Sequence, residues 1–282
     1  MKVLVFGKSG QVAQALSAYD GVTLLSRDEA DLSDAKTCAD LIATSGADAV
    51  INAAAYTAVD VAETDAKTAA LVNTDAPTAM AQACAASGKV FVHISTDYVF
   101  DGSGNDARVE DDPTNPLGIY GSTKLAGESG VIAAGGQFAI LRTSWVFSAH
   151  GNNFVKTMLR LGAERDALNV VSDQIGGPTP AVDIASAAMK IATAMVQGRG
   201  KNGVYHFSGA PNVSWADFAR TIFHMWGLKV DVTDIPTSDY PTPAKRPLNS
   251  RLDCSKISQI YGIKRPDWRD GLRDAMTELE AK

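Results

Sequence analysis

The stretch MKVLVFGKSGQVAQAL, residues 1–16, decides how the rest of the chain is interpreted. Four apolar residues, Val3 to Phe6, precede two glycines three positions apart, Gly7 and Gly10, and then a run with helical spacing. An apolar strand that enters a helix through a glycine-rich turn is typical of the first unit of a nucleotide-binding sheet. Ordinary strand-to-helix turns also use glycine, so this stretch alone leaves both interpretations open.

Apolar runs alternate with alanine-rich, helix-like stretches through the first half of the chain. The runs are continuously apolar, as in strands buried on both faces, and lie at residues 3–6, 22–25, 49–54, 90–95 and 138–144. This alternation predicts an α/β fold with a Rossmann-like, doubly wound parallel sheet. In such sheets ligands bind beyond the carboxyl ends of the strands.

The pattern changes after about residue 145, which suggests a second part of the molecule. Helical patterns lie at residues 151–161, 180–196 and 213–227, and four prolines make residues 235–247 irregular. We expect a dinucleotide-binding domain from residues 1–144, to which residues 170–207 return. We expect a smaller, discontinuous substrate-binding lobe mainly from residues 145–169 and 208–282.

The composition of the 282-residue chain disfavours several function classes. The formal net charge is −6 and no basic cluster stands out, so we expect no nucleic-acid partner. The sequence shows neither a signal-peptide pattern nor a run of ~20 apolar residues, so we expect a cytoplasmic protein without a membrane partner. Cys38, Cys84 and Cys254 are widely spaced without histidine at ligand spacing, so we expect buried thiols and no metal site.

The first turn and the second strand together suggest a cofactor. Gly7 can form the tight turn, and Gly10 lets the backbone approach a pyrophosphate. The second strand ends in Leu-Ser-Arg, whereas NAD sites usually show an acidic residue near this position. Arg27 can pair with a 2′-phosphate, which favours NADPH, with NADH as the second choice. Alternatively, Arg27 is a solvated cation and Asp28 binds the ribose.

The segment IYGSTKLAGE contains a tyrosine and a lysine, Tyr120 and Lys124, that share one face of a helix. A nearby ammonium favours the phenolate and lowers the pKa of a tyrosine from about 10. Such a pair can exchange a proton with an oxygen on a carbonyl or alcohol carbon. Alternatively, Lys124 pairs with Glu128 and Tyr120 only covers the surface.

The segment HISTDYVFDG places two hydroxyls, Ser95 and Thr96, at the end of the fourth expected strand. A hydroxyl at that edge can donate a hydrogen bond to a substrate carbonyl and polarise it. Alternatively, these hydroxyls cap a turn. Taken together and in this order, the glycine turn, the hydroxyls and the Tyr-Lys pair resemble the extended branch of the short-chain dehydrogenase/reductase superfamily.

Longer blocks are similar to those of one family within that superfamily, the dTDP-4-dehydrorhamnose reductases. The similar blocks run from residue 6 to residue 253 and are FGKSGQV, NAAAYTAVDVAE, STDYVFDG, YGSTKLAGE, RTSWVF, GNNFVKTMLRL, DQIGGPT and YPTPAKRPLNSRLD. The Asn152–Phe154 and Pro241–Asp253 blocks discriminate best. The resemblance implies NAD(P)H-dependent reduction of the 4-keto group of dTDP-4-dehydro-6-deoxy-L-mannose, which gives dTDP-L-rhamnose.

The resemblance also implies roles for individual residues. Tyr120 is the expected general acid, Lys124 the residue that orients the nicotinamide ribose and tunes Tyr120, and Thr96 the ligand of the keto oxygen. The glycine motif and the resemblance together give the expected cofactor contacts: Gly7, Gly10, Gln11, Val12, Arg27, Asp31, Leu32, Ala54, Ala55, Thr57, Tyr120 and Lys124. The expected substrate contacts are Thr96, Asp97, Trp145, Asn153 and Arg246.

Several of these contacts carry a more specific expectation. Asp31 and Leu32 would flank the adenine, and Trp145 would form a wall of the sugar pocket. Asn153 and Arg246 are the candidates for the nucleotide end of the substrate, where Arg246 can meet a diphosphate bidentately.

Some positions depart from the family pattern or leave alternatives open. Enterobacterial members carry glutamates for a magnesium-linked dimer where this chain has Ala15 and Val182, so we expect no metal, and a homodimer stays open. A 4,6-dehydratase would need a glutamate where this chain has Tyr98. The remaining alternatives are another nucleotide-sugar reductase or epimerase, and a non-catalytic NADP-binding regulatory subunit.

Overall fold

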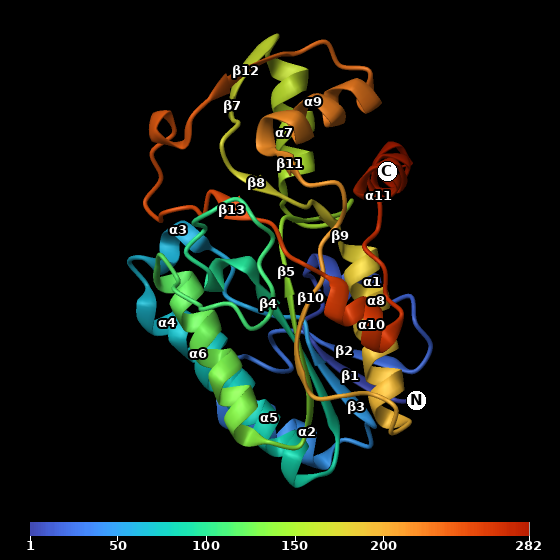
Figure 1. Ribbon diagram of the computed structural model, residues 1–282. Helices are drawn as coiled ribbons and strands as arrows, with labels where there is room; N and C mark the ends of the chain where they lie inside the picture. The colour runs from blue at the N-terminus through green and yellow to red at the C-terminus, as the bar shows by residue number, and fades with distance from the viewer. Residues whose placement is uncertain (282) are drawn as a thin grey trace.

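Figure 1 shows the computed structural model of the chain, which describes residues 1–281. Its centre is a six-stranded parallel sheet in the order β10-β5-β4-β3-β1-β2. The strands are β1 (Val3–Phe6), β2 (Val22–Leu25), β3 (Ala49–Asn52), β4 (Val90–Thr96), β5 (Gln137–Thr143) and β10 (Gly203–His206). The expected doubly wound parallel sheet is confirmed. The chain order reverses on either side of β1, so β1 and β3 flank the position where such sheets bind ligands.

Helices cover both faces of the sheet, which explains why its strands are apolar throughout. One face packs against α1 (Gln11–Leu16), α8 (Ala181–Val196) and α10 (Ser255–Tyr261). The other packs against α2 (Ala35–Thr44), α5 (Ala76–Ala86) and α6 (Ile119–Ala134). Side chains alternate along β4: Val90 and Val92 enter the first core, and Phe91 enters the second. His93 therefore lies on the side of α5 and α6.

A smaller lobe lies beyond one end of the sheet, at the top of Figure 1. It has its own core, which includes Phe147, Phe218, Phe223 and Trp268. Its elements are β6 (Val146–Phe147), α7 (Phe154–Glu164), β7 (Ala167–Val171), β8 (Ile175–Gly176), β9 (Thr179–Pro180), β11 (Val213–Ser214), α9 (Trp215–Trp226), β12 (Asp231–Ile235), a 3-10 turn (Thr237–Asp239), β13 (Asn249–Ser250) and α11 (Trp268–Glu280). Ser148 at the start of the lobe donates to Gln11, which follows β1, so the lobe faces the carboxyl ends of the strands.

The division between the two parts differs in detail from the expected one. Helix α8 and strand β10 join the sheet, as the return of residues 170–207 required, but Leu168 and Val170 of β7 lie in the lobe's core. Strand β7 pairs with β12 of the lobe. Residues 252–263, expected mainly in the lobe, contribute Leu252 and Ile257 to the sheet's core. An apolar pattern shows that a segment is buried but not in which of two cores.

The connection between β3 and α5 is irregular. It contains α3 (Val59–Ala62), α4 (Ala66–Ala70) and a turn of π-helix (Leu71–Asp75). A further 3-10 turn, Asp97–Val99, follows β4 directly. Among residues 1–281, no helix is both long enough and apolar enough to span a lipid bilayer.

Candidate active site

Thr96 and Tyr120 meet at the carboxyl edge of the sheet. Thr96 is the last residue of β4, and Tyr120 lies in the first turn of α6. Their side chains lie close enough for the Thr96 hydroxyl to lower the pKa of the Tyr120 phenol. Thr96 Oγ1 also donates to Asp97 Oδ1 over 3.2 Å and accepts from the Tyr98 amide over 3.2 Å. The structure therefore joins the expected carbonyl ligand and the expected proton donor in one contact.

Burial controls the ionisation of Tyr120. It raises the pKa of the Tyr120 phenol above its ordinary value, and the Thr96 hydroxyl only partly offsets this effect. Lys124 is not among the groups that shift this pKa, so the expected tuning of Tyr120 by Lys124 stays a prediction. Tyr120 is therefore a neutral phenol at pH 7, which is the form that can donate a proton.

Lys124 is 2% exposed, and its amine is directed at strand β4. Nζ donates to the Ile94 carbonyl over 2.8 Å and lies 3.1 Å from His93 Nε2. Burial lowers the pKa of Lys124 to about 8, against the opposing charge of Glu128. The alternative ion pair between Lys124 and Glu128 does not form.

Glu128 instead pairs with Arg142 of β5. Its Oε2 lies 2.7 Å from Arg142 Nη2, and its Oε1 accepts from Ser95 Oγ over 2.5 Å. All three side chains are buried. Ser95 thus belongs to an internal ion-pair network, and Thr96 is the hydroxyl that faces Tyr120.

Asp97 has a buried carboxylate oxygen without a protein partner. The side chain is 3% exposed, and its Oδ1 accepts from Thr96 Oγ1 over 3.2 Å. Its Oδ2 has no hydrogen-bond partner among the described residues. Burial raises the pKa of Asp97 to about 6, although the nearby Ser250 and Thr96 hydroxyls lower it. A buried acceptor left unsatisfied beside Thr96 fits the hydroxyl of a sugar.

Trp145 has an unusual backbone at the entry to the lobe. Its φ is +50°, the only positive φ of a non-glycine residue among residues 1–281. Its ring stacks on Trp215 with centroids 3.5 Å apart and planes 11° apart. A Cβ on Gly176 would lie 2.8 Å from the Trp145 ring. Such a strained conformation persists only where the surroundings determine it, and it is typical of functional positions.

The two candidates for the nucleotide end make different contacts. Arg246 Nη2 lies 2.5 Å from Asp60 Oδ2, and Nη1 donates to the Tyr98 hydroxyl over 3.2 Å. The Tyr98 ring meets the Tyr120 ring edge-on at 5.4 Å, so Arg246 lies one side chain away from Tyr120. Asn153 caps α7 and donates to Gln11 Oε1 over 3.0 Å, so it lies at the glycine-rich turn.

The expected cofactor residues gather around the ends of β1, β2 and β3. Gly7 has φ +113°, and a Cβ there would lie 3.4 Å from both Ala53 and Ala54, so small residues border this crevice. Gly10 precedes α1, and Gln11 connects the turn to Ser148 and Asn153 of the lobe. Ala55 is half-buried; Arg27, Asp31 and Thr57 are exposed; and the Val12 and Leu32 side chains are buried in the two sheet cores.

These positions fit a dinucleotide. They surround the point where the strand order reverses, the usual ligand position in such sheets, and there the Gly7 turn lies against the backbone of Ala53 and Ala54. Arg27 at the end of β2 is an exposed cation beside it. Val12 and Leu32 can contribute only backbone or the edge of the apolar wall, because their side chains face the cores.

Three buried polar residues were missed by the sequence reasoning. Asn52 and His93 are 1% exposed each and interrupt otherwise apolar strands, which was the available signal. Asn73 lies in the π-helical turn and binds the backbone of Tyr56 in both directions, by Oδ1 at 2.9 Å and Nδ2 at 3.1 Å. It anchors the loop after β3, which carries the expected cofactor contacts Ala54 and Ala55.

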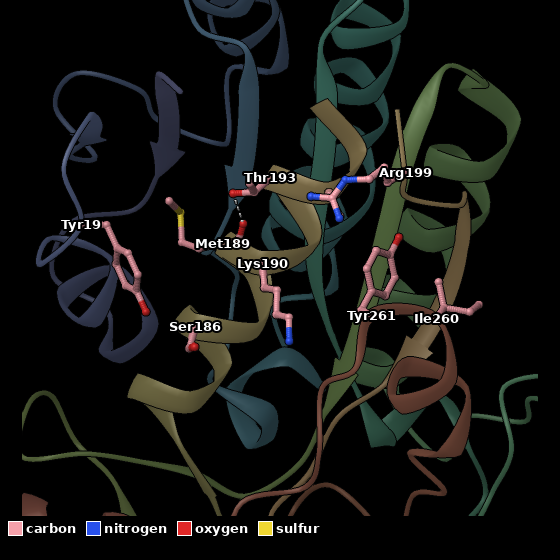
Figure 2. Close-up of a pocket in the computed structure, with 9 residues that line it drawn as sticks. Tyr19, Ser186, Met189, Lys190, Thr193, Arg199, Ile260 and Tyr261 are labelled. Carbon is pink, nitrogen blue, oxygen red and sulfur yellow. Dashed lines mark hydrogen bonds between the residues drawn. The ribbon is translucent and has the colours of Figure 1, made fainter. Parts of the chain in front are cut away.

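A hollow of about 450 Å³ lies elsewhere, on the outer side of α8 (Figure 2). It is lined by Tyr19, Ser186, Met189, Lys190, Thr193, Ala194, Arg199, Ile260 and Tyr261. None of the expected site residues is among them. Lys190 donates to the Gly262 carbonyl, and the Tyr261 hydroxyl donates to the Lys201 carbonyl. Within residues 1–281, no group of three or more His, Cys, Asp or Glu side chains is placed to bind a metal.

Comparisons with known proteins agree with this geometry over the whole chain. The family model for the RmlD substrate binding domain matches residues 1–281. A dTDP-4-dehydrorhamnose reductase from Sinorhizobium fredii is 44% identical, with 97% of this chain and 96% of that protein covered. Two crystal structures are also similar. One is a dTDP-4-dehydrorhamnose reductase from Clostridium acetobutylicum, with TM-score 0.92 and 35% identity over 99% of this chain and 100% of that one.

The second is the enzyme of that name from Bacillus anthracis in complex with NADP, with TM-score 0.91, 33% identity and the same coverage. The similarity therefore extends over both the sheet and the lobe, rather than over the nucleotide-binding half alone. The chain belongs to the dTDP-4-dehydrorhamnose reductase family.

Proposed function

We propose that this protein reduces the 4-keto group of dTDP-4-dehydro-6-deoxy-L-mannose to dTDP-L-rhamnose, with NADPH as the hydride donor. The full-length similarity to reductases of that name supports the reaction, and the NADP complex of the Bacillus anthracis protein supports the cofactor. The observation that carries the proposal is that the Thr96 and Tyr120 side chains approach each other at the edge of the sheet, with Lys124 one helical turn further on.

The crevice between β1 and β3 would bind the cofactor. Gly7 and Gly10 would approach the pyrophosphate, Ala54 and Ala55 would line the path toward the nicotinamide, and Arg27 would meet a 2′-phosphate. The bound cofactor would supply a hydride to the carbonyl carbon of the sugar.

The chain itself supplies the proton and stabilises the developing charge. The Thr96 hydroxyl donates to the keto oxygen and polarises it. As the carbon is reduced, negative charge develops on that oxygen, and the neutral Tyr120 phenol gives it a proton. The ketone thereby gains a hydride on carbon and a proton on oxygen and becomes a secondary alcohol. Lys124 fixes the ribose and lies on the Tyr120 face of α6.

The lobe and the proline-rich segment would position the sugar nucleotide. Asp97 Oδ2, which lacks a protein partner, would accept from a sugar hydroxyl. The Trp145 ring would cover the apolar face of the deoxysugar. Arg246 retains guanidinium donors beyond those bonded to Asp60 and Tyr98, and these would meet the diphosphate. We assign no substrate contact to Asn153, whose amide is occupied by Gln11 and two lobe carbonyls.

The deciding experiment follows the absorbance of the reduced nicotinamide with enzymatically prepared dTDP-4-dehydro-6-deoxy-L-mannose. NADPH and NADH are compared in parallel, and the product is identified by mass spectrometry and its sugar stereochemistry by NMR. Rapid oxidation of NADPH with formation of dTDP-L-rhamnose is the expected result. Binding of NADPH without any oxidation contradicts the proposal and favours another keto sugar or a regulatory subunit.

We also infer a cytoplasmic location, because the proposed substrate and cofactor are multiply charged and cross bilayers poorly. A homodimer would have to form without the magnesium-binding glutamates of enterobacterial members, since Ala15 and Val182 occupy those positions. Light scattering of the purified protein with and without EDTA distinguishes a metal-independent dimer from a monomer.

A further inference from the structure

We propose that His93, oriented by Asn52, is a positioning residue that controls the proton on Lys124 through the tautomer of its imidazole ring. The inference rests on the function proposed above, because it concerns the lysine beside the catalytic tyrosine. It adds two residues to the machinery that no sequence motif selected.

The geometry is a buried chain of hydrogen bonds across three elements. Asn52 and His93 are paired neighbours in the parallel register of β3 and β4, and their side chains lie on the same face. Asn52 Nδ2 lies 3.2 Å from His93 Nδ1, and His93 Nε2 lies 3.1 Å from Lys124 Nζ. At the other end, the Ala54 amide donates to Asn52 Oδ1 over 3.2 Å. The chain thus connects the loop of the cofactor crevice to Lys124.

The hydrogen-bond network assigns the tautomer of His93. Burial depresses the pKa of His93 well below its ordinary value, so the ring is neutral. A neutral imidazole has one N–H donor and one acceptor. Because the Ala54 amide occupies Asn52 Oδ1, the Asn52 amide group turns its NH₂ toward His93 and donates to Nδ1. The ring proton is therefore on Nε2 and points at Lys124 Nζ.

This tautomer favours one protonation state of Lys124. A neutral amine has a lone pair that accepts from Nε2–H, while one of its hydrogens donates to the Ile94 carbonyl. An ammonium has no lone pair, so it would place two donors against each other in a buried site. Protonation of Lys124 therefore requires His93 to move its proton to Nδ1 and Asn52 to turn its amide, which breaks the bond to Ala54.

The other ionisable groups near this chain lie on α6, α5 and α2 and at the end of β4. On α6, Tyr120 is a neutral phenol, and Glu128, which pairs with Arg142 of β5, raises the pKa of Lys124 through its charge. Asp97 at the end of β4 acts on Tyr120 rather than on Lys124. The groups on the helices beyond are the Cys84 thiol of α5, whose pKa burial raises, and Cys38, Lys36 and Asp40 of α2, of which the last two pair with each other at the surface.

The first test observes the tautomer directly and needs no turnover. The protein contains four histidines, so a sample labelled with ¹⁵N-histidine gives few ring signals, and His93→Gln assigns those of His93. We expect a neutral ring with its proton on Nε2 at pH 9, where Lys124 is a neutral amine, and a shift of that proton toward Nδ1 as the pH falls through about 8. In Asn52→Asp, the carboxylate still accepts from Ala54 but also accepts from His93, so the proton should appear on Nδ1 even at pH 9. A wild-type ring protonated on Nδ1 at pH 9 overturns the inference.

The second test measures the pH dependence of kcat/KM in the same proteins. In Asn52→Asp, His93 Nε2 becomes an acceptor for the Lys124 ammonium. The limb of the pH profile that is assigned to Lys124 should therefore move to higher pH by about one unit or more, which is a tenfold change in proton affinity. A purely structural role for Asn52 would lower the rate without moving that limb, and this outcome also overturns the inference. The control is His206→Gln, a buried histidine of β10 that contacts Arg142, which should leave the limb in place.

The two tests separate this inference from the proposed function. If the protein fails to reduce the keto sugar but shows the Nε2 proton and its switch in Asn52→Asp, the proposed function fails and the control of Lys124 stands. If the protein reduces the sugar but the His93 proton does not move in Asn52→Asp, the proposed function stands and the control of Lys124 by His93 fails.

Discussion

At the scale of single residues, burial decides the chemistry of the site more than neighbouring charge does. The Tyr120 phenol, the Lys124 amine and the Asp97 carboxyl all have pKa values shifted toward the neutral form, and burial is the largest cause for each. Neutral groups suit a reduction, because the enzyme must donate a proton to a developing alkoxide.

Replacing Tyr120 by phenylalanine removes only the hydroxyl that donates this proton. We expect Tyr120→Phe to lower kcat by about 10²–10⁴-fold, the usual contribution of a positioned general acid. NADPH affinity, measured by fluorescence titration, should change little. The control is Tyr240→Phe, which removes the hydroxyl of an exposed tyrosine. Phe100→Tyr is not suitable as a control, because Phe100 is buried next to two arginine side chains. Retained turnover in Tyr120→Phe would show that another group donates the proton.

Asp97 gives a prediction in which stability and activity change in opposite directions. Its folded pKa of about 6 exceeds its ordinary value of 3.8, so the native state binds the proton more tightly than the unfolded chain. The wild type therefore loses stability as pH rises from about 4 to 6, and the loss persists above pH 6. Asp97→Asn has no such ionisation and should lose none of it.

The measurement is urea unfolding of wild type and Asp97→Asn at several pH values. Between about pH 4 and pH 6, the free energy of unfolding of the variant should rise relative to that of the wild type. The relative rise should reach up to about 3 kcal/mol for a two-unit shift in the pKa of Asp97. The kcat/KM of the variant should fall, because the amide replaces one of the two acceptor oxygens with an NH₂ donor. A difference in stability that is independent of pH would mean that Asp97 is not a buried, titrating group.

At the scale of elements, the sequence predicts best where burial is most uniform. The five expected strands are present with ends shifted by at most a few residues, because strands buried on both faces give continuous apolar runs. The alanine-rich stretch 59–88 has helical character, and the structure divides it into α3, α4, the π-helical turn and α5. Alanine-rich periodicity carries no signal for one extra residue in a turn.

The contact between α6 and the π-helical turn is unusually close. A Cβ on Gly127 would lie 2.1 Å from the Asn73 carbonyl oxygen, which is backbone and cannot move aside. Glycine to alanine inside a helix normally stabilises it by about 0.5–1 kcal/mol. Here we expect Gly127→Ala to destabilise the protein by about 1–3 kcal/mol. Because Asn73 anchors the loop after β3, the KM of the Gly127→Ala variant for NADPH should also rise.

Thermal unfolding and steady-state kinetics check this prediction. Ser129→Ala is the matched control, because Ser129 is exposed on the same helix and should change stability by well under 1 kcal/mol. Greater stability of Gly127→Ala than of the wild type would show that α6 can move away from the turn without cost.

At the scale of the whole molecule, the site is assembled from segments far apart in sequence. The Thr96, Tyr120 and Lys124 set was predictable because family motifs name it, and the sheet order brings it together. The Asn52–His93 pair was not predictable from the sequence, because it depends on the register of two strands. The Trp145–Trp215 stack was not predictable either, because it depends on how the lobe docks on the sheet.

Arg246 connects the proline-rich segment of the lobe side to α3 of the sheet side through Asp60. We expect Arg246→Ala to raise KM for the dTDP-sugar by about 10–100-fold, since a hydrogen bond to a charged group contributes about 1.5–3 kcal/mol. KM for NADPH should stay within about twofold. Inhibition by dTDP alone, measured against the sugar substrate, should weaken in parallel because the lost contact is to the diphosphate.

Lys245→Ala is the neighbouring control for this experiment, because Lys245 is exposed and should have little effect. Unchanged inhibition by dTDP in Arg246→Ala would place the diphosphate elsewhere and leave Arg246 with a structural role only.

The stacked indoles at the junction have an optical consequence. Trp145 belongs to the segment that leaves the sheet, and Trp215 begins the lobe helix α9, so their overlap depends on the relative position of the two parts. The ring centroids lie 3.5 Å apart and the ring planes differ by 11°, so the electronic transitions of the two indoles couple as an exciton. Any hinge movement of the lobe would weaken that coupling. The absorption and fluorescence of unlabelled protein therefore depend on how the lobe is placed on the sheet.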